Sequence, residues 1–176
     1  MRSALNPAIN QTIVHCPKCG GQSLSWPTRK NFTCADCGFT LYLNIAAAAA
    51  VIVECKGKIL FGVRAHEPGC GMLDLPGGFV DLDESAEEAA LREVREETGM
   101  ELRELRYLFS IPNRYHYRDV LYDTLDLFFC CRLTELPWMQ ATDELEELLW
   151  IGRDEIVSEN IAFSSVRLAI RRFLEM

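Results

Sequence analysis

GFVDLDESAEEAALREVREETGM occupies residues 78–100 and predicts a loop followed by one well-defined helix. Ser85 and Glu88 have the Ser-x-x-Glu spacing of a capping box, in which each side chain bonds the backbone amide of the other residue. Residues 86–98 are rich in good helix formers, and Gly99 suits a left-handed C-terminal cap. The sequence therefore specifies this helix at both ends.

Three carboxylates share one face of the predicted helix. At about 100° per residue, Glu93, Glu96 and Glu97 fall within one arc of roughly 100°. Because like charges one turn apart repel, a compensating cation is expected, and Mg²⁺ prefers carboxylate oxygens together with water and substrate phosphates. Glu88 and Arg92 are expected to point elsewhere as an i,i+4 pair. The alternative interpretation is that all these charges form only a solvated helix surface.

The same segment carries a known signature. Gly, five residues, Glu, seven residues and Arg-Glu-aliphatic-x-Glu-Glu-x-Gly-aliphatic is the Nudix box. The chain matches it at Gly78, Glu84, Arg92, Glu93, Val94, Glu96, Glu97, Gly99 and Met100. It therefore resembles a Nudix hydrolase, a family that cleaves nucleoside diphosphates linked to another group and uses Mg²⁺ or Mn²⁺ on this helix.

The resemblance implies roles for individual residues. Glu93, Glu96 and Glu97 would bind the metal and polarise the attacking water. The implied catalytic set also contains Gly78, Glu84 and Arg92, of which the last two would brace the loop against the helix. The general base would be Glu93 or one of three glutamates in a late acidic loop, Glu144, Glu146 and Glu147.

Eight cysteines are present, and four of them form two Cys-x-x-Cys pairs, each followed by glycine. These four are Cys16, Cys19, Cys34 and Cys37. Four thiolates suit a structural Zn²⁺, because they fill its tetrahedral shell and leave no position for water. A redox role is the alternative. The other four are expected to be buried or half-buried apolar residues without disulfides, namely Cys55, Cys70, Cys130 and Cys131.

The remaining pattern predicts an α/β chain with two parts. Residues 1–43 are interpreted as a loose leader and a zinc ribbon with β-prone stretches at 24–26, 31–33 and 39–43, and residues 44–176 as the Nudix domain. Within that domain we expect an α/β/α sandwich with a mixed sheet. The expected elements are a hairpin of 45–53 with 58–63, a loop over 64–78, a strand at 102–109 that breaks at 110–118, a half-buried strand over 125–133, an acidic loop at 144–147, a strand at 148–151 and a helix capped by Ser164 or Ser165.

Composition narrows the partners. The chain has 26 acidic and 18 basic residues and a net charge of −8, which disfavours long nucleic acid but allows a nucleotide whose charge a cation neutralises. The N-terminus has no apolar signal core, and the apolar run 45–53 is too short to span a bilayer. We expect a soluble cytoplasmic protein without membrane contact, and the family resemblance adds a homodimer as an expectation.

The expected reaction is hydrolysis of a pyrophosphate bond that releases a nucleoside monophosphate. NADH pyrophosphatases also join a zinc ribbon to this box, but their Ser-Gln-Pro-Trp-Pro-Phe-Pro motif is replaced here by Ser-Ile-Pro-Asn-Arg-Tyr-His at residues 110–116. NADH, ADP-ribose and FAD therefore stay open as substrates. The candidate substrate-binding residues are Arg64, Pro76, Gly77, Gly78, Tyr115 and Tyr117.

Two other functions remain open at this stage. The first is a regulatory domain that senses a nucleotide without cleaving it, with the ribbon recruiting a partner. The second is hydrolysis of RNA caps or damaged nucleotides.

Overall fold

The computed structural model describes residues 9–118, 120–142 and 144–176. Its contacts group into two compact units. One contains the described residues up to Ala46 together with Arg114–Asp123, and the other contains Ala47–Asn113 and Thr124–Met176. The boundary predicted between residues 43 and 44 stays a prediction. Most of the predicted leader lies outside the described residues, which begin with the short helix α1 (Ile9–Thr12).

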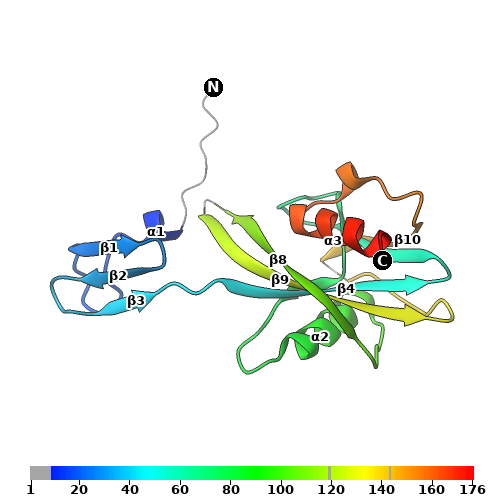
Figure 1. The fold of residues 1–176 in the computed structure, drawn as a ribbon, viewed down its shortest axis with the longest axis horizontal. Helices are drawn as coiled ribbons and strands as arrows, with labels where there is room; N and C mark the ends of the chain where they lie inside the picture. The colour runs from blue at the N-terminus through cyan, green and yellow to red at the C-terminus, as the bar shows by residue number, and fades with distance from the viewer. Residues whose placement is uncertain (1–8, 119, 143) are drawn as a thin grey trace. The chain divides into compact units, whose positions relative to one another are not determined.

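The smaller unit contains a three-stranded antiparallel sheet in the order β1-β2-β3 (Figure 1). Its strands are β1 (Leu24–Thr28), β2 (Asn31–Cys34) and β3 (Thr40–Tyr42). Phe32 is fully buried, and its ring lies between those of Trp26 and Phe39, with centroids 5.0 and 6.4 Å away. The three predicted β-prone stretches are thus confirmed. Phe32 lies in this small core together with the buried Cys16 and Cys34.

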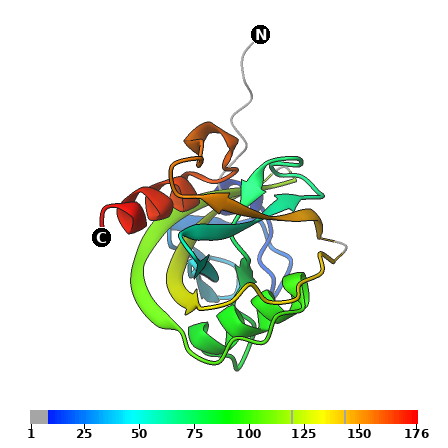
Figure 2. The ribbon, with the colours of Figure 1, turned by 90° about the vertical axis from the view of Figure 1, so that its right-hand side faces the viewer.

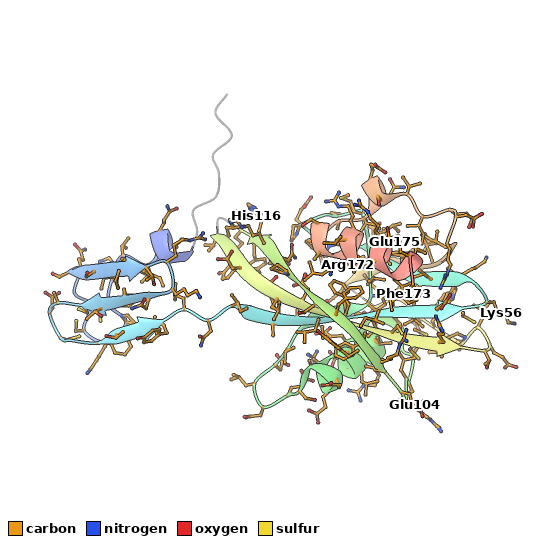
Figure 3. The ribbon with its side chains drawn as sticks, in the orientation of Figure 1. Lys56, Glu104, His116, Arg172, Phe173 and Glu175 are labelled. Carbon is orange, nitrogen blue, oxygen red and sulfur yellow. The ribbon has the colours of Figure 1, made fainter. Side chains whose placement is uncertain are left out.

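The larger unit is built on a sheet with the strand order β10-β5-β4-β9-β8. The hairpin predicted at its centre is confirmed as β4 (Ala46–Cys55) and β5 (Lys58–Arg64), which pair antiparallel. Lys56 and Gly57 have positive φ angles at the connecting turn, where Figure 3 labels Lys56. Figure 1 shows β4 and β9 running in the same direction, so the sheet is mixed, as expected.

Two helices cover opposite faces of this sheet, which confirms the predicted α/β/α sandwich (Figures 1 and 2). The helices are α2 (Ala86–Thr98) and α3 (Ser164–Leu174). Because side chains alternate along a strand, buried residues of β4 serve both cores. Val51 and Val53 pack in the cluster of α2, whereas Ile52 packs in the cluster of α3 with Phe173, which Figure 3 labels. In the described ranges, no helix is long and apolar enough to cross a membrane.

Two strands differ from their predicted form. The predicted break at 110–118 is wrong, because β8 (Arg106–Tyr117) continues through Pro112 as a strand at the edge of the sheet, where a missing N–H is tolerated. The predicted half-buried strand is β9 (Val120–Leu133), but it is buried on both faces. Phe128 and Phe129 are both almost inaccessible, because α3 covers one face and α2 the other.

Short strands also occupy segments that the sequence predicts as loops. β6 (Leu73–Asp74) pairs with β5, and β7 (Gly77–Phe79) pairs with β4, inside the loop predicted at 64–78. The acidic loop predicted at 144–147 lies mostly within β10 (Leu145–Gly152), because Leu145 is buried against the sheet. β6 and β7 thus pair with interior strands, beyond the β4–β5 ladder, and β7 leads into the segment that precedes α2.

The start of α3 and one cysteine require further corrections. The last connection contains the short 3-10 helix η1 (Ser158–Asn160), and α3 then begins after Phe163, with no side-chain cap. The predicted serine cap is wrong, because the Ser165 hydroxyl donates to the buried Asp126 carboxylate at 2.6 Å. Cys70 is exposed rather than buried, and its thiol contacts the Ala65 carbonyl at 3.4 Å.

Candidate active site and metal centres

Helix α2 is fixed at both ends by the residues that the sequence singles out. The Ser85 N–H donates to the Glu88 carboxylate at 2.8 Å, and the Glu88 N–H donates to the Ser85 hydroxyl at 3.2 Å. At the other end, Gly99 has φ +72° and donates its N–H to the Arg95 carbonyl. The buried face of α2, which includes Ala89, Ala90 and Val94, packs on the sheet.

Arg92 joins the helix to the loop that precedes it. Its guanidinium makes two parallel bonds to the Glu84 carboxylate, at 2.9 and 3.0 Å, and a third to the Phe79 carbonyl at 3.0 Å. Nη1 also donates to Glu93 at 2.8 Å and to Glu96 at 3.1 Å. The predicted Glu88–Arg92 pair is therefore wrong, because Glu88 bonds the N-cap serine and Arg92 turns toward the carboxylates.

Two glycines allow the helix carboxylates to lie close to β7. The Gly77 N–H donates to Glu97 Oε2 at 3.0 Å. A Cβ on Gly77 would lie 2.3 Å from the Ala49 carbonyl, and a Cβ on Gly78 would lie 2.4 Å from Glu93 Oε1. At Gly77 only glycine fits without a shift of β4, whereas a side chain at Gly78 would displace the Glu93 carboxylate.

Glu93, Glu96 and Glu97 line a cleft of about 510 Å³. The opposite wall comes from the segment between β9 and β10, which supplies Gln140, Ala141, Thr142 and Glu144. This segment is attached to α2, because the Gln140 N–H donates to the Thr98 carbonyl at 2.9 Å. Sequence reasoning missed the contribution of residues 140–142, and a polar segment between two strands is the only signal that pointed to them.

Negative charge accumulates in the cleft. Burial raises the pKa of Glu97 well above its usual range, and the charges of Glu93, Asp74 and Glu144 raise it further, although the Gly77 N–H acts in the opposite direction. Burial also raises the pKa of Glu93, against the effect of Arg92. Glu97 is only 8% exposed. The site therefore holds carboxylates whose ionisation is incompletely compensated by the protein.

A hard divalent cation would supply the missing compensation, since its preferred ligands are carboxylate oxygens. The donor set therefore fits Mg²⁺ or Mn²⁺. The structure does not bring Glu93, Glu96 and Glu97 into one tight ligand set, because Arg92 holds the first two and the Gly77 amide holds the third. Among the described residues, the cysteine cluster is the group whose possible ligand atoms all lie within 4.8 Å of one another.

Other predicted site residues lie elsewhere. Glu146 and Glu147 belong to β10 and are absent from the cleft lining, whereas Glu144 belongs to it. The Arg64 guanidinium donates to Asp74 at 2.8 Å and to the Pro68 carbonyl at 2.7 Å, so its partners are protein groups. The Pro76 carbonyl accepts from the Val51 N–H. A role in substrate binding for Arg64, Pro76, Gly77 and Gly78 stays a prediction.

The two tyrosines predicted to contact substrate belong to the same end of β8. Tyr115 and Tyr117 stack on each other near the end of β8, with ring centroids 6.3 Å apart and planes inclined by 17°. They belong to the smaller compact unit, as does His116, which Figure 3 labels. A role for these tyrosines in binding stays a prediction.

The four ribbon cysteines form a compact cluster. The Cys16 and Cys37 sulfurs are 3.8 Å apart, and those of Cys19 and Cys34 are 3.7 Å apart. A tetrahedral Zn²⁺ with bonds of about 2.3 Å requires sulfurs separated by about 3.8 Å. The glycine after each pair has a positive φ and turns the backbone beneath the sulfurs. The geometry therefore fits the predicted zinc ribbon.

Comparison with known proteins agrees with this fold. The family profile described as "NUDIX domain" matches residues 43–172, and the chain belongs to the Nudix family. A solved structure described as a NUDIX hydrolase from Nitrosomonas europaea is 25% identical, with a TM-score of 0.71 over 93% of this chain and 91% of the other. The NUDIX domain of Shewanella oneidensis NrtR, solved with ADP ribose, shares the fold at 19% identity, with a TM-score of 0.64 over 77% and 91% of the two chains.

Curated relatives match over shorter stretches. An ADP-ribose pyrophosphatase of Methanocaldococcus jannaschii is 42% identical over 78 residues, which are 43% of this chain and 46% of the relative. An NAD-capped RNA hydrolase NudC of Vibrio vulnificus is 33% identical over 104 residues, which are 59% of this chain and 40% of the relative. The matched part thus spans less than half the length of each curated relative.

Proposed function

We propose that this chain hydrolyses the pyrophosphate bond of a nucleoside diphosphate linked to another moiety, of the ADP-ribose or NADH type, and releases a nucleoside monophosphate. The observation that carries the proposal is the cleft of about 510 Å³ in which Glu144 faces the α2 carboxylates. That volume is in the range of small-molecule sites. The names of the two curated relatives, an ADP-ribose pyrophosphatase and an NAD-capped RNA hydrolase, support the substrate class.

The divalent cation is part of the proposal. Mg²⁺ or Mn²⁺ bound there would neutralise the phosphates and activate a water for attack on phosphorus. Glu93, Glu96 and Glu97 would hold it through their carboxylate oxygens. Arg92 would keep Glu93 and Glu96 at a fixed separation, and the Gly77 amide would orient Glu97.

Two residues are candidates for the general base. Glu144 lines the cleft on the wall opposite α2, and it is exposed, so its carboxylate can accept a proton from water. Glu93 is less accessible and is held by Arg92. We therefore assign the base to Glu144 and the role of ligand to Glu93.

The test is release of nucleoside monophosphate from a panel of NADH, NAD⁺, ADP-ribose, FAD, diadenosine polyphosphates, nucleoside triphosphates and NAD-capped RNA, each with Mg²⁺ or Mn²⁺. The expected result is turnover of ADP-ribose or a dinucleotide, with cleavage between the two phosphates. Saturable binding of one compound without turnover of any would instead identify a nucleotide sensor and contradict the proposal.

A further inference from the structure

Arg64 and Asp74 form an ion pair just before the segment Leu75-Pro76-Gly77. Neither residue lines the cleft. The Arg64 side chain is 21% exposed and that of Asp74 is 13% exposed. Arg64 lies at the end of β5, and its guanidinium also contacts the Phe163 ring, with the carbon 4.9 Å from the centroid. The arginine is therefore held on three sides, by Asp74, by the Pro68 carbonyl and by the residue that precedes α3.

Asp74 uses its two oxygens for two different contacts. Oδ2 accepts from Arg64 at 2.8 Å, and Oδ1 accepts from the Leu75 N–H at 2.9 Å. The second contact fixes the first peptide of the segment Leu75-Pro76-Gly77. Two residues later, the Gly77 N–H donates to Glu97 Oε2. The Asp74 carboxylate thus holds the start of this segment, and the Gly77 amide at its end orients the Glu97 carboxylate.

Two further backbone bonds anchor the chain at Leu73 and at Pro76 but do not hold the Leu75 amide. The Pro76 carbonyl accepts from the Val51 N–H at 2.9 Å, and the Leu73 carbonyl accepts from the Ala162 N–H at 2.8 Å. One anchor is on β4 and the other is in the connection before α3. Between them, the Asp74 side chain accepts from the Leu75 N–H and so sets the direction of that amide.

Keeping a charge at this position is costly. Burial raises the pKa of Asp74 to about 6 despite the neighbouring Arg64, and Asp126 adds repulsion. The Asp74 charge also raises the pKa of Glu97. An apolar pair of similar volume is often at least as stable as a buried ion pair, which favours a role for this pair beyond stability.

We propose that Asp74, held by Arg64, is a positioning residue for the α2 carboxylates: it fixes the Leu75–Gly77 backbone so that the Gly77 amide meets Glu97. This inference rests on the proposed function, because it assigns Asp74 a part in holding the cation ligand in place. Removal of Asp74 would let the Gly77 amide move and leave Glu97 without its donor. The affinity for a divalent cation and kcat would then fall, whereas KM would change little.

Asp74→Ala and Asp74→Asn test this in the full-length protein. Alanine removes both contacts of Asp74, whereas asparagine keeps an acceptor for the Leu75 N–H and leaves Arg64 without a counter-charge. The control is Glu54→Gln. Glu54 is an equally buried acid, also 13% exposed, and it is paired with Arg132 and Arg153 away from the cleft. In both variants a half-buried carboxylate is lost from its arginine partners, but only Asp74 is bonded to the segment that ends at Gly77.

The readout is Mn²⁺ affinity measured by electron paramagnetic resonance, with kcat, KM and thermal midpoint recorded in parallel. We expect Asp74→Ala to weaken Mn²⁺ binding and lower kcat by about 10- to 100-fold, as for other groups that orient metal ligands, with KM within about twofold. Asp74→Asn should lose less Mn²⁺ affinity and less kcat than Asp74→Ala. Glu54→Gln should lower the thermal midpoint but leave Mn²⁺ affinity within about twofold.

Equal Mn²⁺ affinity in Asp74→Ala and Glu54→Gln would overturn the positioning role. If Asp74→Ala does not fold, the same comparison is made with Asp74→Asn and Arg64→Lys, under the same criterion.

The amide NMR resonance of Gly77 separates this inference from the proposed function. A shift of that resonance in the Asp74 variant but not in Glu54→Gln supports positioning even if no substrate is turned over. An unchanged resonance contradicts positioning even if the wild type is active.

Discussion

The ribbon and the cleft each contain a cluster of groups that repel one another when ionised, thiols in the ribbon and carboxylates in the cleft. The two clusters differ in how closely their ligand atoms are arranged. The four sulfurs all lie within 4.8 Å of one another around one point. The α2 carboxylates instead turn toward Arg92 and the Gly77 amide and face a cleft of about 510 Å³. A closed cluster suits a structural ion, whereas an open one leaves room for water and substrate.

The largest expected effect is loss of zinc. Cys34→Ser removes one of the four thiols that would hold zinc, and because a structural Zn²⁺ held by such a cluster contributes on the order of 10 kcal/mol to folding, the ribbon should unfold. Zinc content should fall from about one ion per chain to near zero, and the smaller unit should become sensitive to protease. Cys70→Ser, outside the cluster, is the control and should keep its zinc.

Cys34→Ser also tests whether the cleft works independently of the ribbon. The cleft is lined entirely by residues of the larger unit, so turnover by Cys34→Ser should stay within about tenfold of the wild type once aggregation is excluded. Complete loss of turnover in a soluble variant would show that the ribbon contributes to the active site.

The next effect concerns Glu97. Glu97→Gln keeps an acceptor for the Gly77 N–H but removes the charge that a divalent cation requires. We expect kcat to fall by roughly 10²- to 10³-fold, which corresponds to about 3 to 4 kcal/mol of transition-state stabilisation. Glu87→Gln, exposed on the first turn of the same helix, should match the wild type. Full turnover with unchanged Mg²⁺ affinity in Glu97→Gln would refute its assignment as a ligand.

A smaller effect is expected at Arg92. A lysine keeps the positive charge but cannot make the two parallel bonds to Glu84 while also holding Glu93. Turnover of Arg92→Lys should fall by about 10- to 100-fold, because the ligands lose their fixed orientation. Arg95→Lys, on an exposed position of α2, is the matched control. Identical kinetics of the two variants would show that the paired bonds of the Arg92 guanidinium to Glu84 are not needed for turnover.

The smallest effect is a pH dependence of stability. The Arg92 guanidinium holds the pKa of Glu84 below its ordinary value of 4.5. The ion pair therefore stabilises the folded protein above about pH 4.5, and this stabilisation is lost as the pH falls through the lowered pKa. The thermal midpoints of Glu84→Gln and the wild type should differ by a few degrees at pH 7 and converge once the pH is below the lowered pKa of Glu84. A difference independent of pH would assign the effect to packing.

The parts of the fold that follow local rules could be predicted from the sequence. The capping box at Ser85, the left-handed glycine at Gly99 and the two Cys-x-x-Cys pairs each depend on residues close together in the chain, and each is present as predicted. The central hairpin is also local, since β4 and β5 are joined by the turn at Lys56 and Gly57.

Features set by distant neighbours could not be predicted. The alternation in β9 indicated a solvent-exposed face, but α3 covers it and buries Asp126 against Ser165. Helical spacing alone pairs Arg92 with Glu88, whereas the bracing contact of Arg92 with Glu84, which the preceding loop brings within reach, follows only from the family resemblance. In the cleft, the glutamates of α2 follow from helical spacing, whereas the opposite wall at residues 140–142 depends on tertiary contacts.

The most direct test of the two-cluster account is selective metal removal followed by a rate measurement. The full-length protein is treated with EDTA under conditions mild enough to leave zinc bound, and zinc content and release of nucleoside monophosphate are measured on the same sample. The account predicts that turnover falls to background, that zinc stays at about one ion per chain, and that Mg²⁺ or Mn²⁺ restores the rate. Turnover that persists without added cation, or that follows the zinc content, would contradict it.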